Sequence, residues 1–385
     1  MSAATGLSES ASTVPVPTST LIDRAVAALV DARSDHGDVL TRAAWQGVAD
    51  AGLVGLTVPS AYGGAGLDPA AAVEVLVAVA RDFDDSGWLF GAGAHLLACA
   101  MPLALHGSAA LKERYLPAMC DGRLAAGNAM TEAAAGSDVA GLSTTATPAG
   151  PEYVLTGTKT FVTNGPVADV FVVYAQTDAD AGFLGNTAFV VEREVPGVTV
   201  GPAHDKVGME SVLACAVTFD GVRVPADRVI GAPGQGNLIF QESMWWERTI
   251  MPALLVGRMD AVVRHCTAFA RSREQFGRPV VAFQAVSHRL ARMEIARRVA
   301  EQYVLHAATS LVADSHGRGT TASAAKYAAT EAAVAVGEAG MEVLGGAGYL
   351  RGNPAEALLR AALGARAYSG TNDVQLEIVA RGMGA

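Results

Sequence analysis

The sequence predicts an α+β protein in which a helical region, a β region and a second helical region follow one another. Apolar residues recur at three- and four-residue spacing in the first and last thirds of the 385-residue chain, as in amphipathic helices. Between them lie short β-branched and aromatic runs bounded by Gly, Pro, Asn and Asp, as in an antiparallel sheet or barrel. We therefore expect a helical domain over residues 21–126, a β domain over 127–235 and a helical bundle over 236–385.

The chain begins with a small, polar, proline-containing segment, residues 1–20, which has neither a basic nor an apolar stretch. This composition predicts a disordered tail rather than a signal peptide. Helical periodicity follows in four segments: 21–40, 41–56, 70–83 and 108–122. A turn-rich break, "PSAYGGAGLDP", separates the second segment from the third.

The β region contains five runs with strand-like composition. They are 153–165, 169–177, 187–194, 197–203 and 216–225. In the last third, residues 291–315 and 321–344 are long helical segments that are typical of a bundle.

Composition excludes several classes of protein. A net charge of −10 argues against nucleic acid or an anionic membrane as the main partner. No uninterrupted apolar run approaches the ~18 residues of a membrane span, because residues such as His95 and Pro102 break the longest one. The cysteines form no CxxC pair and no His-rich cluster, so we expect free thiols in a reducing cytoplasm and neither a disulfide nor a metal site: Cys99, Cys120, Cys215 and Cys266.

Five blocks of sequence carry a resemblance to the acyl-CoA dehydrogenase family. They are "AMTEAAAGSDV" (129–139), "GTKTFVTNG" (157–165), "VTFDGVRVP" (217–225), "SREQFGRPVVAFQ" (272–284) and "EVLGGAGYLRGNP" (342–354). The resemblance spans nearly the whole chain. It implies a helical, β and four-helix-bundle subunit that holds FAD and assembles as a homotetramer or dimer.

Residues in these blocks can contact a flavin on chemical grounds as well. The hydroxyls of Thr131 and Ser137 and the backbone N–H groups around them suit a flavin edge and a pyrophosphate, although an ordinary Gly/Ala loop is the alternative. Phe161 and Thr163 are two residues apart, so we expect them on one face of a strand. The resemblance implies that Phe161, where the family usually has Trp, lies against the isoalloxazine and that Thr163 donates to flavin N5.

The resemblance also implies that "SREQFGRP" reaches the FAD of a neighbouring subunit. Arg273 would clamp the pyrophosphate and Phe276 would lie near the adenine, whereas the alternative for Arg273 is a cation at a helix C-terminus. "LGGAGY" follows a helical pattern and is therefore not a Rossmann turn. The full predicted FAD set is Met130, Thr131, Gly136, Ser137, Phe161, Thr163, Arg273, Phe276, Gln284, Glu342 (where Gln is common), Gly345, Gly346, Thr371 and Asp373.

The catalytic base is predicted from a loss and a gain. Many relatives carry the base in a loop near the C-terminus, but this loop reads "AYSGTNDVQ", with Ser369 in the base position. Other relatives, including the isovaleryl and long branched-chain types, carry it on the first helix after the β domain, directly before an Arg. Here that pair is Glu247 and Arg248. Ser369 is then expected to act only through its backbone N–H.

The stretch "SMWWERTIMP" surrounds this glutamate with apolar residues, which would desolvate the carboxylate and raise its pKa. The alternative is a structural ion pair beside two core tryptophans. Trp245 stands where some relatives have an Asp that meets the pantetheine arm. The predicted substrate residues are Ser137, Met244, Trp245, Trp246, Arg248, Tyr368 and Gly370.

The resemblance implies FAD-dependent α,β-dehydrogenation of an acyl-CoA or acyl-carrier protein thioester in fatty acid or polyketide metabolism. Glu247 would take the α-proton, a hydride would pass from the β carbon to flavin N5, and an electron-transfer flavoprotein would accept the electrons. A flavin oxidase or monooxygenase on the same fold is the alternative enzyme. A ligand-binding homologue without activity is the non-enzyme alternative.

Overall fold

The computed structural model describes residues 18–313 and 317–384. Most of the predicted tail, residues 1–20, therefore lies outside the described residues. The first helix, α1 (Thr18–His36), begins three residues before the predicted domain start at Leu21.

The N-terminal region is helical, as predicted. Local capping explains where its helices begin: Asp68 accepts a hydrogen bond from the Ala71 N–H before α3, and Asp85 accepts from the Gly87 and Trp88 N–H groups before α4. After α1 come α2 (Trp45–Asp50), η1 (Leu53–Gly55), η2 (Ser60–Tyr62), α3 (Pro69–Asp82), α4 (Ser86–His95), the π-helical η3 (Leu96–Ala100), α5 (Met101–His106) and α6 (Ala109–Cys120).

One helical stretch is long and apolar enough to cross a membrane by length and composition, contrary to the expectation from sequence. It runs over Ser86–His106 with a mean hydropathy of 1.6. The π-helical turns of η3 and the position of Pro102 in the first turn of α5 let the helix continue past both expected breaks. Because 83% of the apolar window is buried inside the protein, packing in the core explains its composition.

The middle region folds into a mixed but mainly antiparallel sheet in the order β6-β7-β3-β2-β4-β5-β8, with β1 beside β4. β1 runs parallel to β4, and β2 meets β4 in one parallel pair. The five predicted runs are strands, whereas β1, β2 and β8 were not predicted. The elements are β1 (Ala126–Ala129), β2 (Thr145–Ala149), β3 (Glu152–Thr163), β4 (Val170–Gln176), η4 (Gly182–Gly185), β5 (Asn186–Glu192), β6 (Val198–Ala203), β7 (Ala214–Pro225), η5 (Ala226–Arg228) and β8 (Val229–Ile230).

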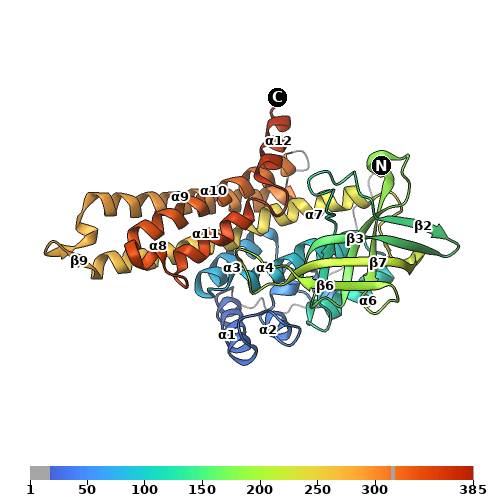
Figure 1. Ribbon diagram of the computed structural model, residues 1–385, viewed down its shortest axis with the longest axis horizontal. Helices are drawn as coiled ribbons and strands as arrows, with labels where there is room; N and C mark the ends of the chain where they lie inside the picture. Colours follow the sequence, from blue (N-terminus) through green and yellow to red (C-terminus); the bar gives the residue numbers. More distant parts are fainter. Residues whose placement is uncertain (1–17, 314–316, 385) are drawn as a thin grey trace.

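The C-terminal region is the predicted four-helix bundle, built by α8–α11, which extend away from the sheet (Figure 1). α7 lies between the bundle and the sheet, and the β9–β10 hairpin forms the far tip. The elements are α7 (Gly236–Ile250), α8 (Pro252–Ser272), β9 (Glu274–Gln275), β10 (Arg278–Pro279), η6 (Val280–Ala282), α9 (Gln284–Ala313), α10 (Arg318–Leu344), η7 (Gly345–Tyr349), α11 (Pro354–Ala365) and α12 (Asn372–Gly382).

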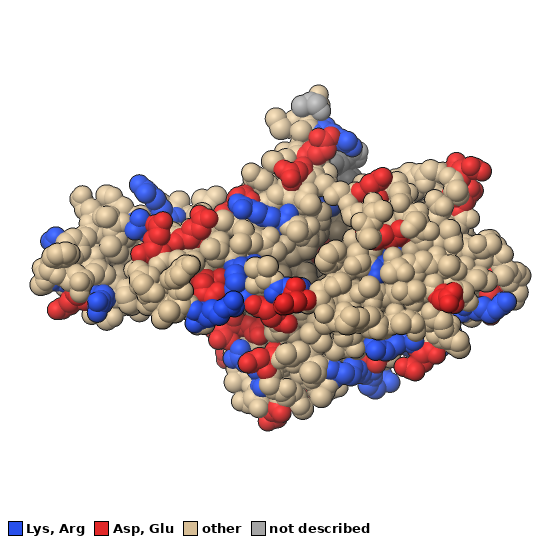
Figure 2. All heavy atoms as spheres, viewed as in Figure 1, with Lys and Arg blue, Asp and Glu red and all other residues tan. Residues whose placement is uncertain are grey.

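The distribution of surface charge and the state of the cysteines can be compared with the predictions from composition. Lys and Arg are interspersed with Asp and Glu over the face shown in Figure 2. All four cysteines are buried free thiols, as predicted: Cys99, Cys120, Cys215 and Cys266.

Candidate active site

The last two turns of α7 bury the predicted base. Glu247 is 7% exposed and Arg248 is 9% exposed. Helical spacing puts Phe240 and Met244 on the same face as Glu247. Phe240 packs against the ring of Tyr174 on β4, with 5.5 Å between ring centroids, and Met244 is buried. This face of α7 therefore turns away from water and towards the sheet.

The two tryptophans beside Glu247 have different neighbours. Arg318 is the first residue of α10, and its guanidinium lies 4.4 Å from the centre of the Trp245 ring. Gly319 permits this approach, because a Cβ there would stand 2.7 Å from the Trp245 Nε1. Trp246 instead packs against the main hydrophobic core. The rings thus point to different sides of α7, as expected for adjacent helical residues.

Burial is the largest influence on the Glu247 carboxylate, and it raises the pKa of that group. The Ser369 hydroxyl donates a hydrogen bond to Glu247 Oε1, and the charges of Arg248 and Lys326 also favour the ionised form, but burial outweighs all three. Glu247 Oε2 accepts no hydrogen bond from any residue that the structure describes. A carboxylate with one free oxygen and a raised pKa is suited to proton abstraction.

Ser369 lies in a loop held against α7. Its backbone is left-handed, with φ 57°, and its carbonyl accepts a 2.8 Å hydrogen bond from Arg248 Nε. The Ser369 N–H makes no hydrogen bond within residues 18–313 and 317–384. The sequence predicts a backbone role only for Ser369. The structure adds a side-chain contact, because the hydroxyl donates a hydrogen bond to Glu247.

Two predicted residues beside Ser369 complete this side of the site. The Tyr368 ring packs on Phe90 of α4, with 4.6 Å between centroids. Burial raises the pKa of the Tyr368 phenol, and the Glu247 charge raises it further. Gly370 has φ 83°, a conformation that glycine adopts without strain.

Sequence reasoning missed Lys326, which is 2% exposed on α10. Its Nζ donates to the Gly370 carbonyl at 3.0 Å and to Asn372 Oδ1 at 2.7 Å. A lone lysine inside the Ala-rich stretch "TASAAKYAAT" was a usable signal, because a buried lysine needs polar partners.

The predicted flavin loop sits over a buried ion pair that sequence reasoning also missed. Lys159 Nζ is 2.8 Å from Glu132 Oε1 and donates to the Met130 carbonyl at 3.0 Å. Glu132 also accepts hydrogen bonds from the Ser143 and Thr144 N–H groups and the Ser143 hydroxyl. This network fixes both ends of the loop.

The loop and the end of β3 meet at one exposed edge. The Thr160 N–H donates to the Thr131 carbonyl at 2.8 Å. Phe161 is 65% exposed and has φ 53°, within a register shift between Lys159 and Val162. The expectation of a regular strand through Phe161 and Thr163 is therefore wrong at Phe161, because the bulge interrupts the alternation of side chains.

This edge has the chemistry that a flavin requires. Phe161 presents an open aromatic face, with the His204 ring 5.1 Å away on one side. Thr131 and Thr163 are half-buried hydroxyls beside it, and a Cβ at Gly136 would meet no atom within 4 Å. An exposed aromatic ring, hydroxyl donors and an open loop fit a flat ring system with a polar rim.

The remaining predicted FAD residues divide between two ends of the subunit. Thr371 caps α12 near Ser369, and Asp373 follows it. At the far tip, Phe276 is 93% exposed on the β9–β10 hairpin. Glu342 of α10 reaches the same end, where it pairs with Arg289 of α9 at 2.8 Å. The other members of the tip group are exposed: Arg273, Gln284, Gly345 and Gly346.

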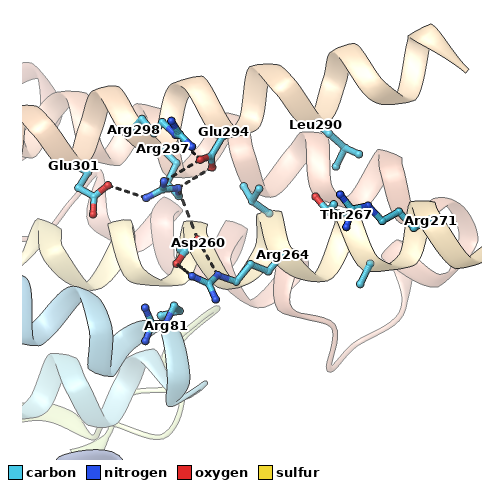
Figure 3. A pocket seen from close by; sticks show the side chains of 12 residues that line it. Arg81, Asp260, Arg264, Thr267, Arg271, Leu290, Glu294, Arg297, Arg298 and Glu301 are labelled. Carbon is cyan, nitrogen blue, oxygen red and sulfur yellow. Dashed lines mark hydrogen bonds and ion pairs between the residues drawn. The ribbon is translucent and has the colours of Figure 1, made fainter. Parts of the chain in front are cut away.

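A groove of about 740 Å³ lies between α3, α8 and α9 and is lined mainly by charged side chains (Figure 3). It includes none of the predicted site residues. Its charges are mostly paired within one helix: Arg297 contacts Glu294 and Glu301 of α9 at 2.9 and 2.8 Å, and Arg264 contacts Asp260 of α8 at 3.1 Å. Arg297 also lies 3.8 Å from Asp260, which links α9 to α8, so we assign the groove to bundle packing. Within the described residues, no group of three or more His, Cys, Asp or Glu is placed to hold a metal ion.

Three family models together match almost the whole chain. They describe the N-terminal, middle and C-terminal domains of acyl-CoA dehydrogenase and match residues 18–123, 127–222 and 234–384. The chain is 38% identical over 349 residues to an L-prolyl-[peptidyl-carrier protein] dehydrogenase of Pseudomonas fluorescens, covering 90% of this chain and 92% of that protein. It is 34% identical to isovaleryl-CoA dehydrogenase of Oryza sativa subsp. japonica, covering 88% of this chain and 82% of that protein.

Solved structures agree with these matches. The prolyl acyl carrier protein oxidase AnaB superposes with a TM-score of 0.90 at 33% identity, covering 96% of this chain and 98% of that one. The FAD complex of PigA gives 0.89 at 32% identity, with 97% and 99% coverage. Butyryl-CoA dehydrogenase of Megasphaera elsdenii also gives 0.89, at 28% identity, with 98% and 100% coverage.

The fold, the site and these relatives define a class of protein, the FAD-dependent oxidoreductases that dehydrogenate acyl thioesters. Within that class, the chain belongs to the acyl-CoA dehydrogenase family.

Proposed function

We propose that this enzyme dehydrogenates an acyl group held on the phosphopantetheine arm of a carrier protein, with Glu247 as the base. The carrier is supported by the names of relatives at 38% and 34% identity, both L-prolyl-[peptidyl-carrier protein] dehydrogenases. A prolyl group is accordingly the first candidate substrate. Trp245, which stands where some relatives have an Asp and lies against the Arg318 guanidinium, is consistent with a different hold on the arm.

The single observation that carries the mechanism is the buried Glu247 beside the unused Ser369 N–H. Glu247 Oε2 takes the α-proton, while Oε1 stays bonded to the Ser369 hydroxyl. Loss of that proton places negative charge on the thioester oxygen, which the Ser369 N–H stabilises. When bound, FAD supplies the acceptor for the hydride that leaves the β carbon.

The substrate is tested by mixing the FAD-loaded enzyme with thioesters without oxygen and following the loss of flavin absorbance at 450 nm on the order of milliseconds to seconds. The panel pairs butyryl, isovaleryl and prolyl groups, each on CoA and on a carrier protein. We expect the carrier-bound form of one acyl group to reduce flavin at least about tenfold faster than its CoA form at equal concentration, a difference of roughly 1.4 kcal/mol. Equal rates for the two forms would contradict the carrier assignment.

We further propose a homo-oligomer in which the hairpin tip contributes to the FAD site of another copy. The tip residues Arg273 and Phe276 are exposed, and the hairpin that carries Phe276 lies at the opposite end of the bundle from α7 (Figure 1). α9 also carries exposed apolar residues at helical spacing, a surface that suits contact with a second copy: Ile295, Val299 and Tyr303.

Arg273→Ala tests this arrangement against Arg271→Ala, a matched control two residues earlier on the end of α8. We expect Arg273→Ala to lose FAD on gel filtration and Arg271→Ala to keep it, with sedimentation showing a dimer or tetramer for both. A monomeric wild-type enzyme that retains FAD would contradict the proposal.

We propose an electron-transfer flavoprotein as the electron acceptor and the cytoplasm as the location. A similar structure, with a TM-score of 0.89 at 28% identity, is described as the electron transferring flavoprotein of Acidaminococcus fermentans. The four free thiols suit a reducing compartment. Oxygen is the second candidate acceptor, because AnaB is named an oxidase. Rapid reoxidation of the reduced enzyme by air would favour oxygen.

A further inference from the structure

Lys326 is a buried cation outside the predicted catalytic machinery. It is 2% exposed and lies on α10 next to the fully buried Ala325. An ammonium group in such a place is costly unless its donors are used. Both acceptors that satisfy it belong to the segment after Ser369: the Gly370 carbonyl at 3.0 Å and Asn372 Oδ1 at 2.7 Å.

This segment is held from two directions. Arg248 Nε of α7 donates to the Ser369 carbonyl at 2.8 Å, and Lys326 of α10 donates to the next carbonyl, that of Gly370. Gln375 Nε2 reaches the same two carbonyls, at 3.2 and 2.8 Å. Two consecutive peptide groups are therefore fixed by side chains from three helices.

The fixed segment is left-handed at two consecutive residues, and only the first of them is strained by it. Ser369 has φ 57° and Gly370 has φ 83°. For a residue other than glycine the left-handed region costs about 1 kcal/mol or more, so it persists only where the surroundings impose it. The direction of the Ser369 N–H depends on that conformation.

A second layer holds Lys326 and its acceptor in turn. Asn372 Nδ2 donates to Glu331 Oε1 at 2.7 Å, and Glu331 is paired with Arg366 at 2.6 Å. The Asn372 amide is thus oriented with its oxygen towards Lys326. Burial and the Arg248 charge lower the pKa of Lys326 to about 7, and an amine donates hydrogen bonds in either protonation state.

We propose that Lys326 is a positioning residue that keeps the Ser369 N–H directed at the substrate carbonyl by holding the Gly370 carbonyl and Asn372. The inference rests on the proposed function, in which that N–H stabilises the oxygen of the deprotonated thioester. Lys326 itself touches neither the substrate nor the transferred proton.

The test uses Lys326→Met, which keeps the length of the side chain but removes the donor, and Lys326→Gln, which keeps a shorter neutral donor. Lys206→Met is the matched control, because Lys206 Nζ also donates to a backbone carbonyl, that of Val212, but in another part of the molecule. FAD content and melting temperature are measured for all three variants. Should Lys326→Met not fold, Lys326→Gln carries the test with an intermediate effect.

The probe is a (methylthio)acetyl thioester, presented on CoA and on a carrier protein. Its α-carbon can lose a proton, but its β position is sulfur, so no hydride can follow. Absorbance of the ionised probe beside oxidised flavin reports the pH at which the bound probe ionises. This equilibrium measures stabilisation of the oxygen and not the speed of the base.

We expect Lys326→Met to raise that ionisation pH by roughly 1 to 2 units and to slow flavin reduction by roughly 10–100-fold, with probe affinity within about twofold of wild type. Lys326→Gln should fall between Lys326→Met and wild type, and Lys206→Met should match wild type. An unchanged ionisation pH in a folded, FAD-loaded Lys326→Met enzyme overturns the inference. The proposed function fails separately, if Glu247→Gln reduces flavin at the wild-type rate.

Discussion

Two buried glutamates, one in the loop beside the sheet and one in α7, have opposite acid–base properties. Glu132 is 4% exposed and Glu247 is 7% exposed. Burial favours the neutral form of both. At Glu132, hydrogen bonds from Lys159, Ser143 and Thr144 overcome burial and lower the pKa to about 2. At Glu247, the Ser369 hydroxyl and the charges of Arg248 and Lys326 do not overcome burial, so the pKa is raised.

The difference lies in how many donors contact the carboxylate directly. Glu132 accepts from two N–H groups, a hydroxyl and an ammonium, all within 2.9 Å. Arg248 lies next to Glu247 in the chain, but its Nε donates a hydrogen bond to the Ser369 carbonyl. A saturated carboxylate is a structural anchor, whereas one that keeps a free oxygen can accept a proton.

The largest expected effect is on the rate of flavin reduction when the α7 carboxylate, Glu247, is replaced. Glu247→Gln keeps size and shape but cannot take a proton, so anaerobic flavin reduction should fall by ~10²–10⁴-fold. FAD content should not change, since the predicted flavin contacts are at Thr131 and Phe161. Stopped-flow absorbance with the best thioester measures the rate, and an undiminished rate would place the base elsewhere.

A second substitution in the Glu247→Gln background tests whether a carboxylate on the loop can replace the carboxylate on α7. Ser369 Oγ contacts Glu247, so a carboxylate at residue 369 reaches nearly the same place. Ser369→Glu combined with Glu247→Gln should recover part of the lost rate. No recovery in a folded, yellow double variant would show that the loop cannot present a base to the same carbon.

The next effect is on stability and separates the two carboxylates. Glu132→Gln leaves the Lys159 ammonium without its ion-pair partner, which should cost about 3–5 kcal/mol of unfolding free energy and weaken FAD binding. Glu247→Gln should cost little or stabilise the fold, because a carboxylate with a raised pKa is disfavoured by folding above its unfolded pKa. Denaturant titration of both variants at neutral pH makes the comparison. Equal losses would contradict the distinction.

The pH dependence of stability should carry a third, smaller signature. Because folding lowers the pKa of Glu132 from 4.5 to about 2, its contribution is present above pH 4.5 and is lost as the pH falls towards 2. Wild type should therefore lose stability over that interval more steeply than Glu132→Gln. Urea titrations at several pH values test this, and parallel curves for the two proteins would count against the lowered pKa.

The smallest effect concerns the Ser369 hydroxyl, which donates a hydrogen bond to Glu247. Removing it in Ser369→Ala should raise the pKa of Glu247 further, so the acidic limb of the rate profile should move to higher pH. Ser243→Ala is the matched control, because the Ser243 hydroxyl donates to the Phe240 carbonyl instead, one turn earlier on α7. Identical acidic limbs in wild type and Ser369→Ala would remove the side-chain role of Ser369.

Local sequence alone determined most of the fold. Helical spacing in α3, α9 and α10 and the β-branched runs of β3, β4, β5 and β7 specify the elements, because each pattern records which residues face a core. The resemblance then predicted Glu247 as the base from the residue that follows it and from the serine in the alternative base position. These are features of single short segments.

Other elements were decided only by tertiary structure. β1, "AGNA", has no β-branched residue and becomes a strand because it pairs with β4. Ser86–His106 reads as broken at His95, yet His95 is buried within the helix, with its Nδ1 accepting from the Ala126 N–H and its Nε2 bonded to the Met119 carbonyl. Burial lowers the pKa of this imidazole to about 4 and keeps it neutral.

Tertiary structure also decided how the site works. Glu247 and Ser369 are 122 positions apart, and Lys326 and Gly370 are 44 apart, so no local pattern reports that they touch. Periodicity tells which side of a helix is buried, but a hydrogen bond depends on the position of a second segment to within a few tenths of an ångström. The sequence therefore determined which residue could be the base, and only the packing of α7, α10 and the loop between α11 and α12 decided that its carboxylate would be buried with one oxygen free.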